Sequence, residues 1–333
     1  MSEYLYYPGC SLDGSARAYA RSLEAILRPL GVELREIDDW NCCGATEYFT
    51  LSPLTGHALI GRNLALAEAQ RDGATTLLAP CSACYVNLAK TDHYFRQSTS
   101  FRDRVNGVLA ADELHYTPGA VRVRHLLEVL VDDVGLDQVA ANVSRPLTGL
   151  RVAPYLGCLI ARPDQDRRWA RHEQPRALDR LLAALGAEVV DFPLRTACCG
   201  GHMSQISPAT AWDLIRRIVG AADRASADLL ATVCPMCQMN IDAYQGEMDR
   251  HLGTRYHVPI LFFTQLMGLA FGMPAEALGI GSEVVSAAEA LARIGVSVPP
   301  PEEGQPPVPP AHEARRQKRP SGLPMPEPAE ADR

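Results

Sequence analysis

Hydrophobic and polar residues follow two alternating patterns along this chain. Short apolar runs are typical of buried strands, whereas longer segments with an apolar residue every three or four positions predict helices. Because the two kinds of segment alternate, we expect parallel α/β units. The expected strands are residues 4–7, 32–37, 75–80, 152–156, 188–192, 228–233 and 258–263, and the expected helices are residues 15–30, 54–71, 121–134, 175–185, 209–225 and 264–271.

The order of these elements begins again at Arg151. The sequence is therefore an internal repeat, and we expect two similar domains at residues 1–145 and 146–275. Each is expected to have a small parallel sheet flanked by helices, with a pseudo-two-fold axis relating the two. Residues 276–297 are expected to add one peripheral helix. Residues 298–333 are rich in proline and charge, which is typical of a disordered tail.

Composition narrows the range of functions. The 333 residues are 47% hydrophobic with a net charge of −7, which suits a globular protein without the basic surface that binds nucleic acid. No apolar run is long enough to span a membrane. The first residues lack the basic start and apolar centre of a signal peptide. We therefore expect a cytoplasmic protein, in which structural disulfides are rare.

Ten cysteines fall into the repeat as two sets of five. Each half has one cysteine after its first strand, an adjacent pair before a glycine, and a C-x-x-C motif after its third strand. The thiols of Cys234 and Cys237 stand at an expected helix start, where the helix dipole favours their anionic form. The first set is Cys10, Cys42, Cys43, Cys81 and Cys84, and the second set is Cys158, Cys198, Cys199, Cys234 and Cys237.

Four kinds of site compete for these thiols. A tetrahedral zinc site takes four ligands and leaves one thiol of each set over. Disulfides suit an even count, but a reducing compartment and the strain of vicinal bridges oppose them. A thioredoxin-like redox pair uses a C-x-x-C motif alone. Iron–sulfur ligation uses thiolates throughout and is the interpretation we favour; five thiolates then indicate either a cubane with a spare cysteine or a cluster of another shape.

The cysteine spacing and its flanking residues resemble a known family. The two copies, C-x31-CCG-x36-C-x-x-C and C-x39-CCG-x33-C-x-x-C, are similar to the duplicated cysteine-rich CCG domain. The flanking segments resemble the B subunit of heterodisulfide reductase, and the resemblance covers residues 3–272. These segments are Tyr-Tyr-Pro-Gly-Cys-Ser at 6–11, Trp-Asn-Cys-Cys-Gly-Ala at 40–45, Arg-Asn-Leu-Ala at 62–65 and Phe-Thr-Gln-Leu at 263–266.

The resemblance implies a cofactor, a reaction and partners. Each set of five cysteines is implied to hold a noncubane [4Fe-4S] cluster, and a disulfide is implied to be reduced or formed between the two clusters by one-electron steps. The ten cysteines would then be catalytic through their clusters. The chain has no ferredoxin motif and no flavin or nicotinamide fingerprint, so we expect a ferredoxin-type iron–sulfur subunit and a flavin subunit as partners. The substrate would be a small-molecule or carrier-bound disulfide.

Two other functions remain open. One is the B subunit of a sulfur-oxidising complex with a similar set of subunits, which acts on persulfide or carrier-bound sulfur. The other is an electron-transfer subunit of a lactate, glycolate or succinate dehydrogenase complex, in which the same domain conducts electrons and cleaves no disulfide. Two complete sets of cysteines favour disulfide chemistry, because ordinary cubanes are sufficient for electron relay.

Three residues beside the cysteines are further candidates. His202 is a candidate proton donor to a product thiolate, although an ordinary loop histidine is the simpler interpretation. Gly44 and Gly200 follow the adjacent cysteine pairs. We expect these glycines to adopt positive φ or to let the backbone approach a cluster, although ordinary turn glycines fit the sequence equally well.

Overall fold

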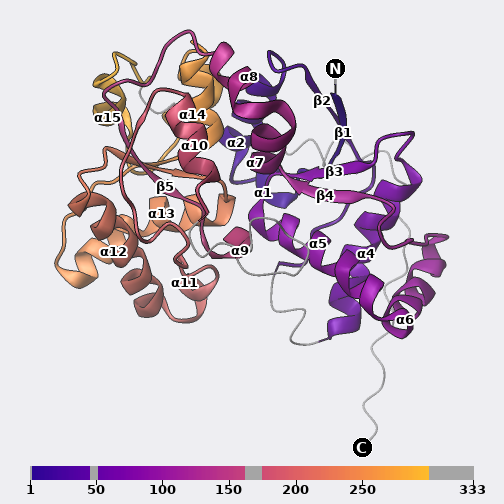
Figure 1. Cartoon of the computed structure of the whole chain (residues 1–333). Helices are drawn as coiled ribbons and strands as arrows, with labels where there is room; N and C mark the ends of the chain where they lie inside the picture. The colour runs from indigo at the N-terminus through magenta and orange to yellow at the C-terminus, as the bar shows by residue number, and fades with distance from the viewer. Residues whose placement is uncertain (1, 46–51, 162–174, 300–333) are drawn as a thin grey trace, which may run out of the picture. The chain divides into compact units, whose positions relative to one another are not determined.

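Two parallel sheets of four strands organise the computed structural model, which describes residues 2–45, 52–161 and 175–299 (Figure 1). The strand order is β2-β1-β3-β4 in the first half and β6-β5-β7-β8 in the second, so both halves have one topology. The predicted α/β fold class is therefore confirmed. The strands are β1 (Ser2–Tyr6), β2 (Val32–Glu36), β3 (Thr76–Ala79), β4 (Arg122–His125), β5 (Arg151–Tyr155), β6 (Glu188–Val189), β7 (Leu229–Thr232) and β8 (Ile260–Phe262).

Helices follow the strands in both halves, and the helices expected at residues 15–30, 54–71, 175–185, 209–225 and 264–271 are present with their ends shifted by a few residues. In α4, Ser52 caps the first turn by accepting a hydrogen bond from Thr55 N, and Pro53 fills the first helical position. The α-helices are α1 (Cys10–Asp13), α2 (Arg17–Leu27), α4 (Pro53–Ala69), α5 (Ser82–Gln97), α6 (Thr99–Leu109), α7 (Leu126–Glu128), α8 (Leu136–Ala141), α9 (Cys158–Ala161), α10 (Ala177–Ala184), α11 (Met203–Ile206), α12 (Pro208–Arg224), α13 (Pro235–Leu252), α14 (Phe263–Ala270) and α15 (Ala288–Ala292). Short 3₁₀ segments are η1 (Ala110–Asp112) and η3 (Glu276–Leu278), and η2 (Val129–Gly135) is a π-helix.

The helix expected over residues 121–134 is wrong in its first part. Residues 122–125 form β4, which pairs with β3 at one edge of the first sheet. The buried guanidinium of Arg124 lies 3.4 Å from Asp132 and 3.2 Å from Asp133. Both aspartates lie in the following π-helix, η2. An edge strand whose buried arginine is neutralised in this way needs no apolar run, so its sequence pattern resembles the start of the helix that follows it.

The segment after α14 is more deeply packed than a peripheral helix. Only residues 288–292 of the expected helix are α-helical, and Ala287 and Leu291 are fully buried in the core. Val298 packs against the same core, whereas the rest of the expected tail, from residue 300, lies outside the described residues.

This core also includes side chains of both halves, among them Leu5 and Phe262. The domain boundaries near residues 145 and 275 therefore stay a prediction.

The two halves pack against each other in a reciprocal way. Helix α1 of the first half contacts α13 of the second, and α9 of the second half contacts α5 of the first (Figure 1). Helix α2 packs on α14, where the hydroxyls of Ser22 and Thr264 are 2.7 Å apart. Since α1 and α9 each begin with the first cysteine of a set, each half presents that cysteine near the C-x-x-C helix of the other half.

Candidate metal centres

Each C-x-x-C motif begins a helix directly after a central strand. Cys81 is the extended N-cap residue of α5, and Cys234 is the extended N-cap residue of α13, which has Pro235 in its first turn. Cys84 and Cys237 lie within the first turn of these helices and are buried. The prediction that Cys234 and Cys237 stand at a helix start is confirmed, and Cys81 and Cys84 have the same position on α5. Carboxyl ends of parallel strands are the usual place for functional groups in such sheets.

The thiols of the first set lie together. Cys10 at the start of α1 and Cys42 in the loop after β2 are both exposed, and their Sγ atoms are 3.9 Å apart. The hydrogen bond between them lowers the pKa of Cys42 to about 2 and raises the pKa of Cys10. Cys43 is buried and forms hydrogen bonds through its thiol with Cys42 and Cys84. Cys84 also contacts Cys81 in this way, so all five thiols form one connected group.

The second set repeats part of this arrangement. The Cys237 thiol forms hydrogen bonds with those of Cys199 and Cys234, and the bond from Cys237 is the main reason that the pKa of Cys199 is lowered. The half-buried Cys198 accepts a hydrogen bond from Gly200 N at 3.4 Å. Cys158, also half-buried, begins α9.

Cys81 and Cys234 connect the two sets. The hydrogen bond between these buried thiols holds the pKa of Cys81 well below its usual value. An unbroken series of thiol–thiol contacts therefore crosses from one half to the other. In order, it passes through Cys10, Cys42, Cys43, Cys84, Cys81, Cys234, Cys237 and Cys199.

Glycines leave room for the innermost sulfurs. Gly9 and Gly157 precede the first cysteine of each set with φ of +74° and +75°. A Cβ atom at either position would lie 2.8 Å from the Sγ atom of Cys84 or Cys237, respectively.

Five thiols on glycine-lined turns fit the donor set of an iron–sulfur cluster. In the described part of the chain, no three His, Cys, Asp or Glu side chains have the geometry for holding a single metal ion.

A buried tyrosine supports each adjacent cysteine pair. Tyr7 donates a hydrogen bond to Asn41 O at 2.7 Å, and Tyr155 donates one to Ala197 O at 2.8 Å. Asn41 and Ala197 directly precede Cys42 and Cys198. Burial, and next the neighbouring thiols, raise the pKa of both tyrosines well above the usual value. These tyrosines are therefore neutral hydrogen-bond donors that fix the entry to each pair.

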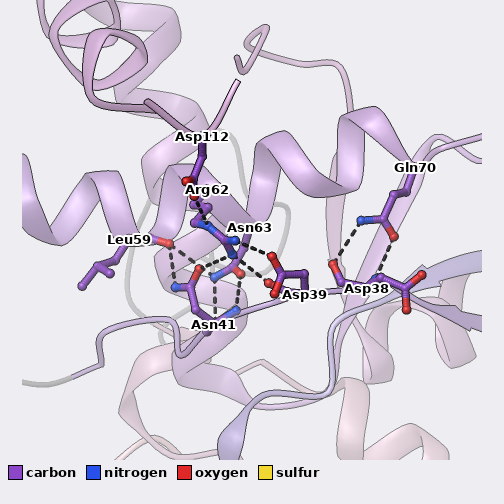
Figure 2. Close-up of polar contacts among 8 residues, drawn as sticks. All are labelled: Asp38, Asp39, Asn41, Leu59, Arg62, Asn63, Gln70 and Asp112. Carbon is purple, nitrogen blue, oxygen red and sulfur yellow. Dashed lines mark hydrogen bonds and ion pairs between the residues drawn. The ribbon is translucent and has the colours of Figure 1, made fainter. Parts of the chain in front are cut away.

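In the first half, a polar network also holds the loop before Cys42 (Figure 2). The fully buried Asn63 accepts a hydrogen bond from Asn41 N at 2.8 Å and donates one to Asn41 O at 2.9 Å. Its neighbour Arg62 donates to the Asp39 carbonyl at 2.7 Å and forms an ion pair with the Asp39 carboxylate. The side chain of Gln70 closes the other end of the loop on Asp38 N and O.

The candidate residues beside the cysteines lie in two turns. Gly44 and Gly200 have φ of +63° and +96°, so the expectation of positive φ is confirmed. A Cβ atom at Gly200 would lie 3.3 Å from the Cα and Cβ atoms of Ala211, whereas Gly44 faces open space. His202 occupies the N-cap position of the short helix α11, where its side chain makes no capping hydrogen bond, and is half-buried. A role for these three residues in the reaction stays a prediction.

Sequence reasoning missed several residues that contact the cysteine loops. Asn63 lies within a segment quoted for the family resemblance, but nothing local predicts that it binds the Asn41 main chain 22 residues away. Asn87 and Asn240 stand three positions after Cys84 and Cys237 and contact Cys43 and Cys199 of the adjacent pairs, respectively. The signal for them is present in both halves, because each motif is C-x-x-C-x-x-N.

The sequence matches known proteins over both halves. The CCG family of cysteine-rich domains matches residues 4–89 and 152–242. The 8-methylmenaquinol:fumarate reductase membrane anchor subunit of Wolinella succinogenes is 35% identical over 285 residues, which are 86% of this chain and 98% of that protein. The B subunit of the ferredoxin/F(420)H(2)-dependent CoB-CoM heterodisulfide reductase of Methanosarcina acetivorans is 28% identical over 298 residues, which are 88% of this chain and 97% of that protein.

Among solved structures, a hypothetical protein from Helicobacter pylori has a similar fold, with a TM-score of 0.66 at 13% identity. The match covers 86% of this chain and 52% of the Helicobacter pylori protein. Within the described residues, every helix is too short or too polar to cross a membrane. The family match over both halves agrees with the duplicated cysteine sets of the structure. The chain thus belongs to the cysteine-rich CCG domain family, as a duplicated member similar to the B subunit of heterodisulfide reductase.

Proposed function

We propose that this chain is the iron–sulfur subunit of a heterodisulfide reductase-like complex and reduces or forms a disulfide. Cys10, Cys42, Cys43, Cys81 and Cys84 would hold one [4Fe-4S] cluster, and Cys158, Cys198, Cys199, Cys234 and Cys237 would hold a second, both of the noncubane type. When bound, such clusters supply electrons one at a time. Reduction of one disulfide takes two electrons and two protons and yields two thiols, which suits two sites of one plan.

The observation that supports this proposal is the contact between Cys81 and Cys234. Their thiols are buried and close enough to shift each other's pKa, although they belong to different halves. The reciprocal contacts of α1 with α13 and of α9 with α5 bring the remaining cysteines toward the same junction. A disulfide whose two sulfurs are each served by one site requires this proximity. At the solvent side, the exposed Cys10 and Cys42 mark where a substrate sulfur gains access to the first site.

The proposal requires partner subunits. Among the similar proteins, several are named as subunits of heterodisulfide reductase. We infer that a ferredoxin-type iron–sulfur subunit and a flavin subunit exchange electrons with this chain, and that a small-molecule or carrier-bound disulfide is the substrate. Ten free cysteines suit the reducing cytoplasm.

A second candidate is an electron-transfer subunit of a different oxidoreductase complex. It is favoured by the 35% identity to a protein named as the membrane anchor subunit of 8-methylmenaquinol:fumarate reductase, of which the match covers 98%. In this role the same cysteines would hold clusters that conduct electrons, and no disulfide would be cleaved.

Metal analysis of anaerobically purified protein tests the sites. We expect about eight irons and eight sulfides per chain, since two [4Fe-4S] clusters contain that number. Cys43→Ser and Cys199→Ser are matched variants in the two halves, and each should lose about four irons while the other cluster persists. Stoichiometric zinc without acid-labile sulfide would rule the proposal out.

Electron paramagnetic resonance separates the two candidate functions. For a disulfide reductase, adding a thiol to the oxidised protein should produce a new paramagnetic signal, and each single-cluster variant should fail to reduce disulfides. For an electron-transfer subunit, the iron content is the same, but thiols and disulfides leave the spectrum unchanged. Full disulfide reduction by Cys199→Ser would contradict a shared reaction between the two sites.

A further inference from the structure

An asparagine follows each C-x-x-C motif at the same position. Asn87 lies on α5 three residues after Cys84, and Asn240 lies on α13 three residues after Cys237. Residues three apart on a helix share one face. Each asparagine therefore faces the same side of its helix as the second cysteine of its motif.

Both side-chain amides reach the buried cysteine of the adjacent pair. Asn240 Nδ2 lies 3.6 Å from Cys199 Sγ, 3.5 Å from Cys199 O and 2.7 Å from Gly201 O. Asn87 Nδ2 lies 3.2 Å from Cys43 O and 4.0 Å from Cys43 Sγ. The contacts are equivalent in the two halves, but Asn240 is fully buried and Asn87 is half-buried.

The orientation of the Asn240 amide follows from its neighbours. Cys199 O and Gly201 O accept hydrogen bonds only, so the NH₂ group has to face them. The consequence is that Asn240 Oδ1 is buried without a hydrogen-bond partner. An unpaired buried acceptor is unfavourable in a native protein and needs an explanation. Here the amide presents its donors to a thiol and leaves its own oxygen unsatisfied.

We propose that Asn87 and Asn240 are positioning residues whose amides raise the reduction potential of the group bound in their own half, Asn240 more strongly than Asn87. This inference rests on the proposed iron–sulfur function. Reduction places additional negative charge on the ligating sulfurs, and N–H donors near those sulfurs stabilise it. The effect is larger in a buried site, because water screens the interaction less.

The test measures each site in isolation, within the full-length chain. Asn240→Leu is combined with Cys43→Ser, so that only the second set is complete, and Asn87→Leu is combined with Cys199→Ser, so that only the first set is complete. Leucine has the same branched heavy-atom framework as asparagine but donates no hydrogen bond. In redox titrations followed by electron paramagnetic resonance, we expect both substitutions to lower the potential, with the larger shift for Asn240→Leu.

The outcomes are distinguishable. Unchanged iron content with an unchanged potential in Asn240→Leu would overturn the inference while leaving the proposed function intact. Asn240→Asp, which keeps the side-chain shape, is measured in parallel and should also lower the potential, because it exchanges the NH₂ donor for an acceptor. Loss of iron from both Asn240 variants would assign the residue a purely structural role and overturn the inference. Absence of iron and sulfide from the unmodified protein would overturn the proposed function itself.

Discussion

Gly9 has φ of 74° and ψ of 158°, a conformation that is essentially restricted to glycine. Its position is doubly constrained, because a Cβ atom there would also lie 2.8 Å from Cys84 Sγ. We expect Gly9→Ala to destabilise the fold by roughly 1–3 kcal/mol and to lower the iron bound by the first set. Urea unfolding and iron analysis measure the two effects.

Gly31→Ala is the control for the Gly9→Ala variant. Gly31 also has positive φ, at +68°, but a Cβ atom there faces open space. This variant should lose stability through its backbone alone and keep its iron. Equal iron content in Gly9→Ala and the unmodified protein would show that the close approach to Cys84 has no bearing on the site.

At the scale of single elements, a buried ion pair connects helix α10 to the loop before Cys198 in the second site. Arg195, in the loop before Cys198, is fully buried and donates to both carboxylate oxygens of Asp179 on α10, at 2.5 and 2.7 Å. Its carbonyl accepts hydrogen bonds from Leu156 N and Gly157 N, next to Cys158. The pair therefore ties α10 to the turns that carry two cysteines of this set.

We expect Arg195→Met to cost at most about 3–5 kcal/mol of unfolding free energy, because it leaves the buried Asp179 carboxylate with only the exposed Arg176 as its partner, at 2.8 Å. Arg62→Met is the matched variant in the first half, where Asp39 and Asp112 are exposed and such pairs contribute about 0–1 kcal/mol. Denaturant unfolding compares the two. Adding Asp179→Leu to Arg195→Met should restore most of the loss, and a further loss would contradict this account.

At the scale of the whole molecule, Tyr19 connects the two C-x-x-C turns. Its buried hydroxyl lies 3.1 Å from Pro80 O and 3.4 Å from Val233 O, and these residues directly precede Cys81 and Cys234. The Tyr19 ring, on α2, also stacks on Phe262 at a centroid distance of 4.4 Å. One side chain thus holds both turns in place relative to each other.

We expect Tyr19→Phe to cost about 1–3 kcal/mol, because the buried carbonyls of Pro80 and Val233 lose the one hydroxyl donor that they share, and to alter the spectroscopic signals of both sites together. Tyr116→Phe is the control, since the buried Tyr116 hydroxyl donates to Asp92 at 2.7 Å within the first half. The control should lose comparable stability and keep both signals. A change at only one site in Tyr19→Phe would contradict the bridging role.

Much of the fold and the composition of the site could be predicted from local patterns. Helix and strand periodicity is a property of neighbouring residues, so α4, α12 and the central strands β3 and β7 lie where the apolar pattern predicts them. The C-x-x-C motifs begin helices for the same reason. The two sets of five cysteines are defined by their spacing alone. Strand β4 resembles a helix in the sequence because it is a charged edge strand, and its buried Arg124 is neutralised only in the folded protein.

Only the tertiary structure decided how the two sets meet. Cys81 and Cys234 are 153 residues apart, and their contact depends on how the halves pack, which no local pattern encodes. The same is true of Tyr19, which binds one carbonyl in each half. The burial of Arg195 likewise follows from a carboxylate on another element. Spacing therefore determined which residues form the sites, and packing between the halves determined that the two sites lie side by side.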